Sequence, residues 1–259
     1  MNYEMRHFAE AEFAAIPNRK LRERAAEQRL IRLFFSDAAS GYYVEVGANE
    51  PKLTSMTWHL EEVGWTGVLV EPIPELFEAL CRERPRSRVF QAACAAPEAC
   101  GVADFVVTPD LSQSTLKCDA IADPSRVARI ERVQVRTLDD ILREVGDPRL
   151  DFVSIDVEGA QLDVLRGFAL TQHRPRLLLI EDHLTDFQTH RYLARRGYRL
   201  CKRTGLNNWY IPRGTPFQLT SLRERMALLG KLLRTPTRGL EFALKRRRRR
   251  RRDASGAAQ

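Results

Sequence analysis

A glycine turn and an acidic residue in the first third of the sequence are spaced for nucleotide binding. Residues 42–46 form a short apolar segment that ends in Gly47-Ala48-Asn49, and a second apolar segment, residues 67–70, ends in Glu71. A helical pattern lies between them, so the order predicts a βαβ unit. Because both strands of a parallel unit end at the same sheet edge, Glu71 is expected beside Gly47. A carboxylate in that position accepts hydrogen bonds from both hydroxyls of a ribose.

The glycine turn also indicates the kind of nucleotide. It lacks the GxGxxG pattern, whose glycines and helix start cradle a pyrophosphate. Gly47 still permits a sharp turn and a close approach of a ligand to the backbone. These features favour a ligand without phosphates, such as S-adenosylmethionine. The alternative is an ordinary βα turn of an α/β protein.

A second pair of acids follows the buried segment 152–155. Asp156 and Glu158 stand at its carboxyl end and precede Gly159 and a predicted helix at residues 160–166. Ligands of doubly wound sheets bind outside the carboxyl ends of the strands. The two carboxylates are therefore candidates for metal binding, for general-base catalysis or for holding the ammonium group of the cofactor. The alternative is that one of them caps the helix.

Two further candidate residues are His183 and Glu45. His183 follows the buried segment 176–180 and Glu181-Asp182, at the same predicted sheet edge. Histidine is the natural base near neutral pH, although a lone histidine is commonly a surface or capping residue. Glu45, inside the first strand, is expected either to orient the glycine turn or to meet the amino-acid end of a cofactor.

These residues need an α/β domain to position them. Strand patterns occur at residues 42–46, 67–70, 87–93, 99–107, 132–135, 152–155 and 176–180, with a closing antiparallel hairpin at 198–202 and 208–211. Helical patterns cover residues 19–35, 54–63, 75–83, 160–166 and 185–196, and Thr137 is expected to cap a further helix. Residues 108–129 lack clear periodicity, which predicts either a lid or substrate loop or a surface insertion.

The charge of the chain is concentrated at one end. The net charge is +8, but residues 222–259 alone hold 13 Lys/Arg and 3 Asp/Glu, so the remainder is near neutral. The sequence thus divides into an N-terminal helical segment (1–36), a catalytic domain (37–216), an amphipathic helical extension (217–245) and a poly-arginine tail (246–259). A leucine-rich helix followed by a basic run fits a peripheral anchor on an anionic membrane. The alternative is a solvated tail.

Cysteine usage and hydropathy indicate a protein made and kept inside the cell. The five cysteines are an odd number and lack CxxC spacing, which fits reduced thiols. No signal-peptide pattern is present, and no apolar run approaches the roughly 18 residues that span a membrane. The expected location is the cytoplasm, with peripheral attachment to the inner face of the membrane through the basic tail.

The order of the motifs resembles the FkbM family of S-adenosylmethionine-dependent methyltransferases over residues 41–212. The motifs are VEVGANEP, GWTGVLVEP, VRTLDDIL, LDFVSIDVEGAQLDVLRG and LLLIEDH. The resemblance implies a class I methyltransferase fold: a three-layer αβα sandwich around a seven-stranded, mostly parallel sheet with an antiparallel last strand. It also implies methyl transfer to an oxygen, commonly a hydroxyl of a sugar, glycan or secondary metabolite.

The resemblance also assigns roles by position. It implies that Glu45, Gly47 and Asn49 line the methionine end of the cofactor, that Glu71 holds the ribose, and that Asp156 and Glu158 lie beside the methyl group. Many family members carry Asp where this chain has Glu45, and Asp-Gly or Ile-Gly where it has Glu50-Pro51. The leucine-rich, arginine-rich extension is not part of the family pattern.

The expected chemistry is in-line transfer with a base that removes the hydroxyl proton, and the candidates for the base are His183, Glu158 and Asp156. No metal is expected, because nothing in the spacing of Asp156, Glu158 and Asp182 requires one. Three alternatives stay open: a nicotinamide-dependent oxidoreductase, an RNA methyltransferase guided by the tail, and a non-catalytic protein with the same fold. Nucleic acid is not the expected partner, because the domain itself is near neutral and has no basic stripe with interleaved aromatic residues.

Overall fold

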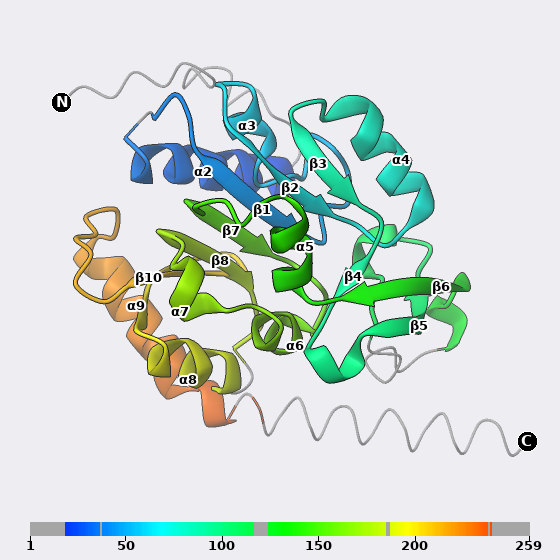
Figure 1. Cartoon of the computed structure of the whole chain (residues 1–259). Coiled ribbons are helices and arrows are strands. Elements are labelled where there is room, and N and C mark those ends of the chain that lie inside the picture. The colour runs from blue at the N-terminus through cyan, green and yellow to red at the C-terminus, as the bar shows by residue number, and fades with distance from the viewer. Residues whose placement is uncertain (1–18, 37, 117–123, 185–186, 238, 240–259) are drawn as a thin grey trace, which may run out of the picture.

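A seven-stranded sheet forms the centre of the molecule (Figure 1). The structure is a computed structural model that describes residues 19–36, 38–116, 124–184, 187–237 and 239. In sheet order the strands are β3 (Ser87–Phe90), β2 (Thr66–Val70), β1 (Tyr42–Val46), β7 (Phe152–Ile155), β8 (Leu177–Glu181), β10 (Asn207–Pro212) and β9 (Tyr198–Thr204).

Strand directions confirm the predicted sheet. The pairs β1–β2, β2–β3, β1–β7 and β7–β8 are parallel, whereas β10 is antiparallel to both β8 and β9. Strand order reverses beside β1, which is the place where open α/β sheets leave a crevice for ligands. The predicted closing hairpin is therefore present, with slightly longer strands than the sequence pattern suggested.

Helices cover both faces of the sheet and complete the three predicted layers. They are α2 (Arg19–Phe34), α3 (Trp58–Glu61), α4 (Pro74–Glu83), α5 (Leu138–Glu144), α6 (Gln161–Arg166), α7 (Leu170–His173), α8 (Gln188–Arg195) and α9 (Leu222–Leu233). One hydrophobic core joins the sheet to α2, α3 and α4, and a second joins its other face to α5, α6, α7 and α8. Both faces of the sheet are thus buried, as expected for parallel strands.

A second, three-stranded sheet differs from the prediction. The segment predicted as one strand at residues 87–93 splits into β3 and β4 (Ala93–Cys94), and β4 joins β6 (Arg129–Arg136) and β5 (Gly101–Val107). The backbone turns between the two strands, where the Ala92 amide donates to the Phe90 carbonyl oxygen. The small sheet has its own apolar core, which includes Ile73 just after β2. It forms one side of the crevice beside β2.

Local hydrogen bonding explains a shorter helix than predicted. Residues 54–63 were expected to be helical, but α3 spans only Trp58–Glu61. The Ser55 and Thr57 hydroxyls and the Met56 amide all donate to the Glu45 carboxylate, which holds this segment as a loop. Thr137, in contrast, caps α5 as predicted by accepting a hydrogen bond from the Asp140 amide.

The four predicted segments of the chain stay a prediction, because the structure does not divide them. Residues 1–18 and 240–259, including the poly-arginine tail, lie outside the described residues. Within the described part of the chain, no helix is both long enough and apolar enough to cross a membrane.

Candidate active site at the carboxyl edge of the sheet

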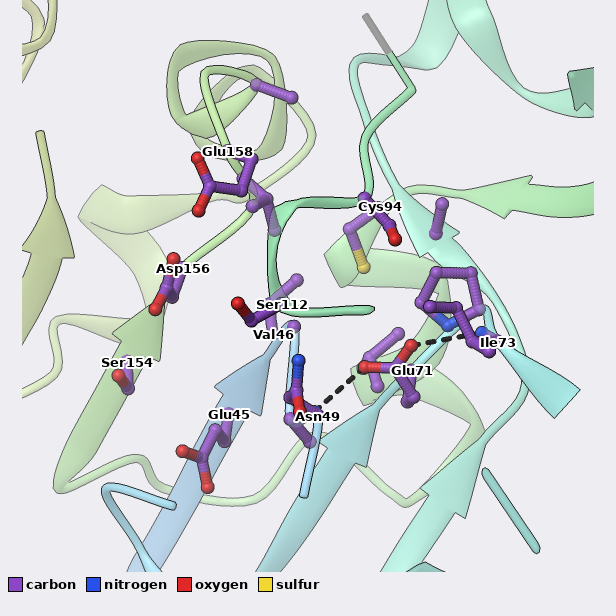
Figure 2. Close-up of a pocket in the computed structure, with 18 of the residues that line it drawn as sticks. Glu45, Val46, Asn49, Glu71, Ile73, Cys94, Ser112, Ser154, Asp156 and Glu158 are labelled. Carbon is purple, nitrogen blue, oxygen red and sulfur yellow. Dashed lines mark hydrogen bonds between the residues drawn. The ribbon is translucent and has the colours of Figure 1, made fainter. Parts of the chain in front are cut away.

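A cavity of about 240 Å³ lies at the carboxyl ends of β1, β2 and β7 (Figure 2). Its wall also includes β4, the loop between β5 and β6, and Arg24 of α2. Six residues singled out in the sequence line this cavity: Glu45, Gly47, Asn49, Glu71, Asp156 and Glu158. Three separate strand ends thus bring these side chains to one place.

Gly47 fixes the distance between the first strand and β7. Its φ is +78°, and a Cβ built on it would lie 1.9 Å from the carbonyl oxygen of Asp156. The Asp156 amide in turn donates to the Val46 carbonyl oxygen at 3.0 Å. Only a residue without a side chain allows this close approach in a left-handed conformation. The glycine turn and the first acid after β7 are therefore packed directly against each other.

Glu71 is buried at the end of β2 and held by two backbone amides. The Asn49 amide donates to Oε2 at 2.8 Å and the Ile73 amide to Oε1 at 3.0 Å. Burial raises the pKa of Glu71 to about 7, and these two hydrogen bonds act in the opposite direction. Each carboxylate oxygen has a second lone pair, so the group retains one acceptor site per oxygen for the two ribose hydroxyls.

Glu45 serves the loop that follows the glycine turn. Its carboxylate accepts from the Ser55 hydroxyl at 2.8 Å, the Thr57 hydroxyl at 2.5 Å and the Met56 amide at 2.6 Å. The side chain lines the cavity, yet these donors belong to the loop after the turn. Of the two roles considered for Glu45, this geometry fits the orienting one.

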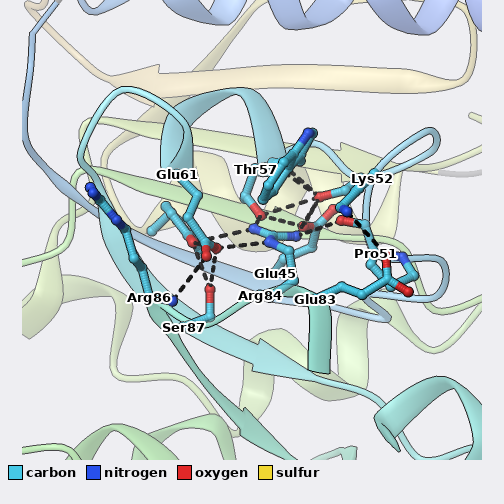
Figure 3. Close-up of polar contacts among 12 residues, drawn as sticks. Glu45, Pro51, Lys52, Thr57, Glu61, Glu83, Arg84, Arg86 and Ser87 are labelled. Carbon is cyan, nitrogen blue, oxygen red and sulfur yellow. Dashed lines mark hydrogen bonds and ion pairs between the residues drawn. The ribbon is translucent and has the colours of Figure 1, made fainter. Parts of the chain in front are cut away.

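Arg84 joins that loop to the end of α4 (Figure 3). Its guanidinium is fully buried and has all five N–H groups satisfied. The five acceptors are Glu61 Oε2 at 2.7 Å, the Pro51 carbonyl oxygen and Ser55 Oγ at 3.0 Å, the Tyr43 hydroxyl at 3.2 Å and Thr57 Oγ1 at 2.8 Å. Arg84, with every N–H group hydrogen-bonded, thus holds the loop at one side of the cavity. The sequence carries no local signal for this role of Arg84.

Three carboxylates cluster at the ends of β7 and β8. One oxygen each of Asp156, Glu158 and Glu181 lies within 4.8 Å of the others. Burial raises the pKa of Asp156 well above its usual range, and the hydrogen-bonded Glu181 carboxyl beside it raises that pKa further. Burial and the charge of Glu181 raise the pKa of Glu158 to about 7. Burial and the neighbouring carboxyl group thus favour the protonated form of Asp156.

The segment that carries Glu158 is held in an unusual conformation. Glu158 has a φ of +45° and Gly159 a φ of +96°, so the backbone turns sharply after β7. The Thr115 hydroxyl, from the loop between β5 and β6, donates to the Glu158 carbonyl oxygen at 3.1 Å. Helix α6 begins only at Gln161, and its N-cap Ala160 supplies no side-chain hydrogen bond. Neither acid therefore caps the helix, which was the alternative considered for the pair.

His183 and Asp182 do not belong to this group of side chains. His183 is exposed and is not among the residues that line the cavity. The trio of acids close enough to share a cation contains Glu181 in place of Asp182. The assignment of His183 as a base and the expectation that no metal is needed both stay predictions.

Two contributors to the site were not singled out in the sequence. Glu181 is the last residue of β8, so the rule that selected Asp156 would also have selected it. Arg24 comes from α2, far from any motif, and is the single basic side chain among the described residues that line the cavity. The sequence carries no local signal for this second contribution.

The sequence itself identifies the family. Residues 45–200, more than half of the chain, match the methyltransferase FkbM domain. The chain therefore belongs to the FkbM methyltransferase family, as the motif resemblance predicted, and it is a methyltransferase whose methyl donor is S-adenosylmethionine. The nicotinamide-dependent oxidoreductase alternative is thereby set aside. No curated protein matches the sequence.

Several solved methyltransferase structures are similar in outline. The METTL16 methyltransferase domain is 11% identical with a TM-score of 0.46, covering 76% of this chain and 68% of that one. TrmK of M. capricolum in complex with S-adenosylhomocysteine is 8% identical with a TM-score of 0.40, covering 86% and 95%. These likenesses carry no information about the acceptor of this chain.

The charged groups that line the cavity suit S-adenosylmethionine. Glu71, at the end of β2, offers two free acceptor sites at the place where folds of this kind bind a ribose. The acidic cluster after β7 suits a ligand that carries both a sulfonium and an ammonium group. Arg24 adds a positive charge to the lining, which suits the carboxylate of the same ligand.

Proposed function

We propose that this chain is an O-methyltransferase that methylates a hydroxyl of a sugar, a glycan or a secondary metabolite. The single observation that carries the proposal is the position of Glu158. It is a carboxylate with a pKa raised to about 7, which lines the cofactor cavity. A base poised near neutral pH suits an acceptor that must lose a proton, as a hydroxyl does.

The chain's own residues divide the work of holding the cofactor. Glu71 accepts the ribose hydroxyls, and Arg24 pairs with the methionine carboxylate. The adjacent carboxyl groups of Asp156 and Glu181 hold the ammonium group. When bound, S-adenosylmethionine supplies a methyl group on a positively charged sulfur. The protein therefore contributes orientation and proton removal.

Glu158 is the preferred base among the three candidates. Burial and the Glu181 carboxyl group raise the pKa of Asp156 well above its usual range, which favours the protonated form of Asp156, a form that cannot accept a proton. His183 is exposed outside the cavity lining. Glu158 would take the proton that the acceptor hydroxyl loses when its oxygen receives the methyl group.

The test compares Glu158→Gln with wild type, using a labelled methyl group and a panel of hydroxylated acceptors. We expect the turnover number to fall by about 10²-fold or more, with the affinity for S-adenosylmethionine changed by less than about threefold. Glu98→Gln, which removes an exposed acid outside the cavity, should match wild type. Unchanged turnover in Glu158→Gln would exclude Glu158 as the base.

The proposed partner is a small hydroxylated acceptor and the proposed location is the cytoplasm. All four cysteines within the described residues are free thiols, which suits a reducing compartment. The RNA methyltransferase alternative is tested by deleting residues 246–259. An RNA enzyme should lose substrate binding, because those residues hold the poly-arginine run. An enzyme for small acceptors should keep its rate in solution.

A further inference from the structure

Helix α9 carries a stripe of apolar side chains on the outside of the molecule. The stripe consists of Leu222, Met226, Leu229 and Leu233, which are 76%, 60%, 49% and 73% exposed. Their spacing of four, three and four residues puts them on one side of the helix. They make up half of the eight large apolar side chains that are strongly exposed among the described residues. Such a concentration marks an interaction surface.

The opposite side of α9 is fixed to the folded domain. Lys202 of β9, itself buried, donates to the Leu219 carbonyl oxygen at 2.9 Å and to Glu224 Oε1 at 2.5 Å. Ser221 and Glu224 form a reciprocal capping box at the helix start. These contacts hold the helix beside the edge strand β9. Figure 1 shows α9 on the outside of the molecule, and the side chains of the apolar stripe are exposed.

The charges around the stripe are positive. Arg223, Arg225, Lys231 and Arg234 lie on α9 or at its end, and the one acid of the helix, Glu224, is paired with Lys202. The chain then continues to the seven consecutive arginines of residues 246–252. Residues 222–259 together carry 13 basic and 3 acidic side chains. An occupant of this surface must therefore be apolar in its interior and anionic at its boundary.

We propose that α9 docks on an anionic lipid bilayer, lying in the plane of the interface with the apolar stripe inserted below the headgroups. Anionic headgroups meet the basic residues, and acyl chains cover the stripe, so a bilayer supplies both kinds of contact. A nucleic acid would pair with the arginines but would leave the leucines in water. A second copy of the helix would cover the leucines but would bring two strongly basic segments together.

The proposal is tested by sedimentation of the full chain with vesicles of phosphatidylcholine alone and with about 30% phosphatidylserine. We expect at least tenfold tighter binding to the anionic vesicles, weakened by added salt. The double variant Met226→Gln/Leu233→Gln should lose about tenfold or more of this affinity at unchanged charge. The matched control Val102→Gln/Ile130→Gln removes two apolar side chains that are 51% and 59% exposed elsewhere, and it should bind as wild type does.

Three outcomes would overturn the proposal. The first is no difference between the two vesicle compositions. The second is full vesicle binding by Met226→Gln/Leu233→Gln, which would mean that the arginines act alone and the helix does not insert. The third is a dimer in solution that the same variant dissolves, with no vesicle binding by wild type, which would assign the stripe to self-association. Sedimentation velocity without vesicles distinguishes this third case.

Discussion

Gly47 and Asp156 meet so closely that no side chain fits between them: a Cβ on Gly47 would lie 1.9 Å from the Asp156 carbonyl oxygen. The contact joins the glycine turn after β1 to the acidic segment after β7. One backbone approach therefore sets the positions of both halves of the proposed cofactor site. Any atom added at Gly47 must move one half relative to the other.

Replacing Gly47 with alanine should therefore damage both stability and cofactor binding. The clash is with backbone, and the positive φ adds strain, so we expect the free energy of unfolding to fall by about 2–4 kcal/mol. We expect the affinity for S-adenosylhomocysteine to fall by at least 10²-fold. The matched control is Gly146→Ala, which has a similar φ of +86° but open space around the added atom. Gly146→Ala should lower the free energy of unfolding only by the backbone strain of about 1 kcal/mol, and it should leave the affinity for S-adenosylhomocysteine unchanged.

The raised pKa of Glu71 predicts that ribose binding depends on pH. The ionised form accepts hydrogen bonds from the two ribose hydroxyls, and the pKa of Glu71 in the free protein is about 7. Ligand binding favours the ionised form, so affinity should fall by up to about tenfold per pH unit below pH 7 and be level above it. Calorimetric titration with 5′-methylthioadenosine isolates this effect, because that ligand lacks the ammonium group that Asp156 and Glu181 are proposed to hold.

Glu71→Gln is the control for that titration and makes a second prediction. Its affinity should be weaker than that of wild type and level between pH 5.5 and 8; the same slope in this variant would assign the titration to another group. A buried acid whose pKa is raised from 4.5 to about 7 destabilises the fold increasingly from pH 4.5 to 7 and by a constant amount above. The free energy of unfolding of Glu71→Gln should therefore rise relative to that of wild type by roughly 1–3 kcal/mol between pH 4.5 and pH 8.

Arg24 should discriminate between ligands by their carboxylate. If it pairs with the methionine carboxylate, Arg24→Gln should bind S-adenosylmethionine about 10–100-fold more weakly, the loss expected for one charge-assisted contact. Its affinity for decarboxylated S-adenosylmethionine and for 5′-methylthioadenosine should match that of wild type. An equal loss for all three ligands would mean that Arg24 acts on the shape of the pocket.

The Arg84 network predicts a large stability effect from one substitution. Arg84→Met leaves Glu61 charged and buried without its cation, and we expect a loss of about 3–5 kcal/mol in the free energy of unfolding, measured with urea. Arg88→Met breaks the exposed pair with Glu144 and should change it by less than about 1 kcal/mol. The double variant Arg84→Met/Glu61→Gln should regain part of the loss, since no unpaired charge remains.

The sheet could be predicted from the sequence because buried parallel strands have a local signature. Runs such as residues 152–155 are continuous and apolar, and the acid that follows each run marks the edge where ligands bind. The small second sheet could not be predicted, because the pairing of β4 with β6 joins segments about 40 residues apart and only the fold decides it. The position of Arg24 in the cavity could not be predicted for the same reason, because it depends on where α2 packs.

The short α3 shows the limit of periodicity in another way. The sequence of residues 54–63 is compatible with a helix. Three donors in the first turn of that predicted helix instead form hydrogen bonds to the Glu45 carboxylate. A tertiary partner thus replaced the helix's own hydrogen bonds. Glu45 itself was visible in the sequence, although which of its two roles it fills depends on these donors.

The packing of α2 limits how this enzyme can be cut or recombined. Its Glu27 accepts hydrogen bonds from Asn207 and Trp209 of β10, its Gln28 donates to the Ser55 carbonyl oxygen, and its Arg24 borders the cavity. Arg24, Glu27 and Gln28 all lie before the matched family region, which spans residues 45–200. A chimera or fragment that begins at residue 45 would expose Trp209, free the loop after the glycine turn and remove one wall of the pocket. In this protein, a fragment that is to keep the site must include α2 as well as the region that matches the family.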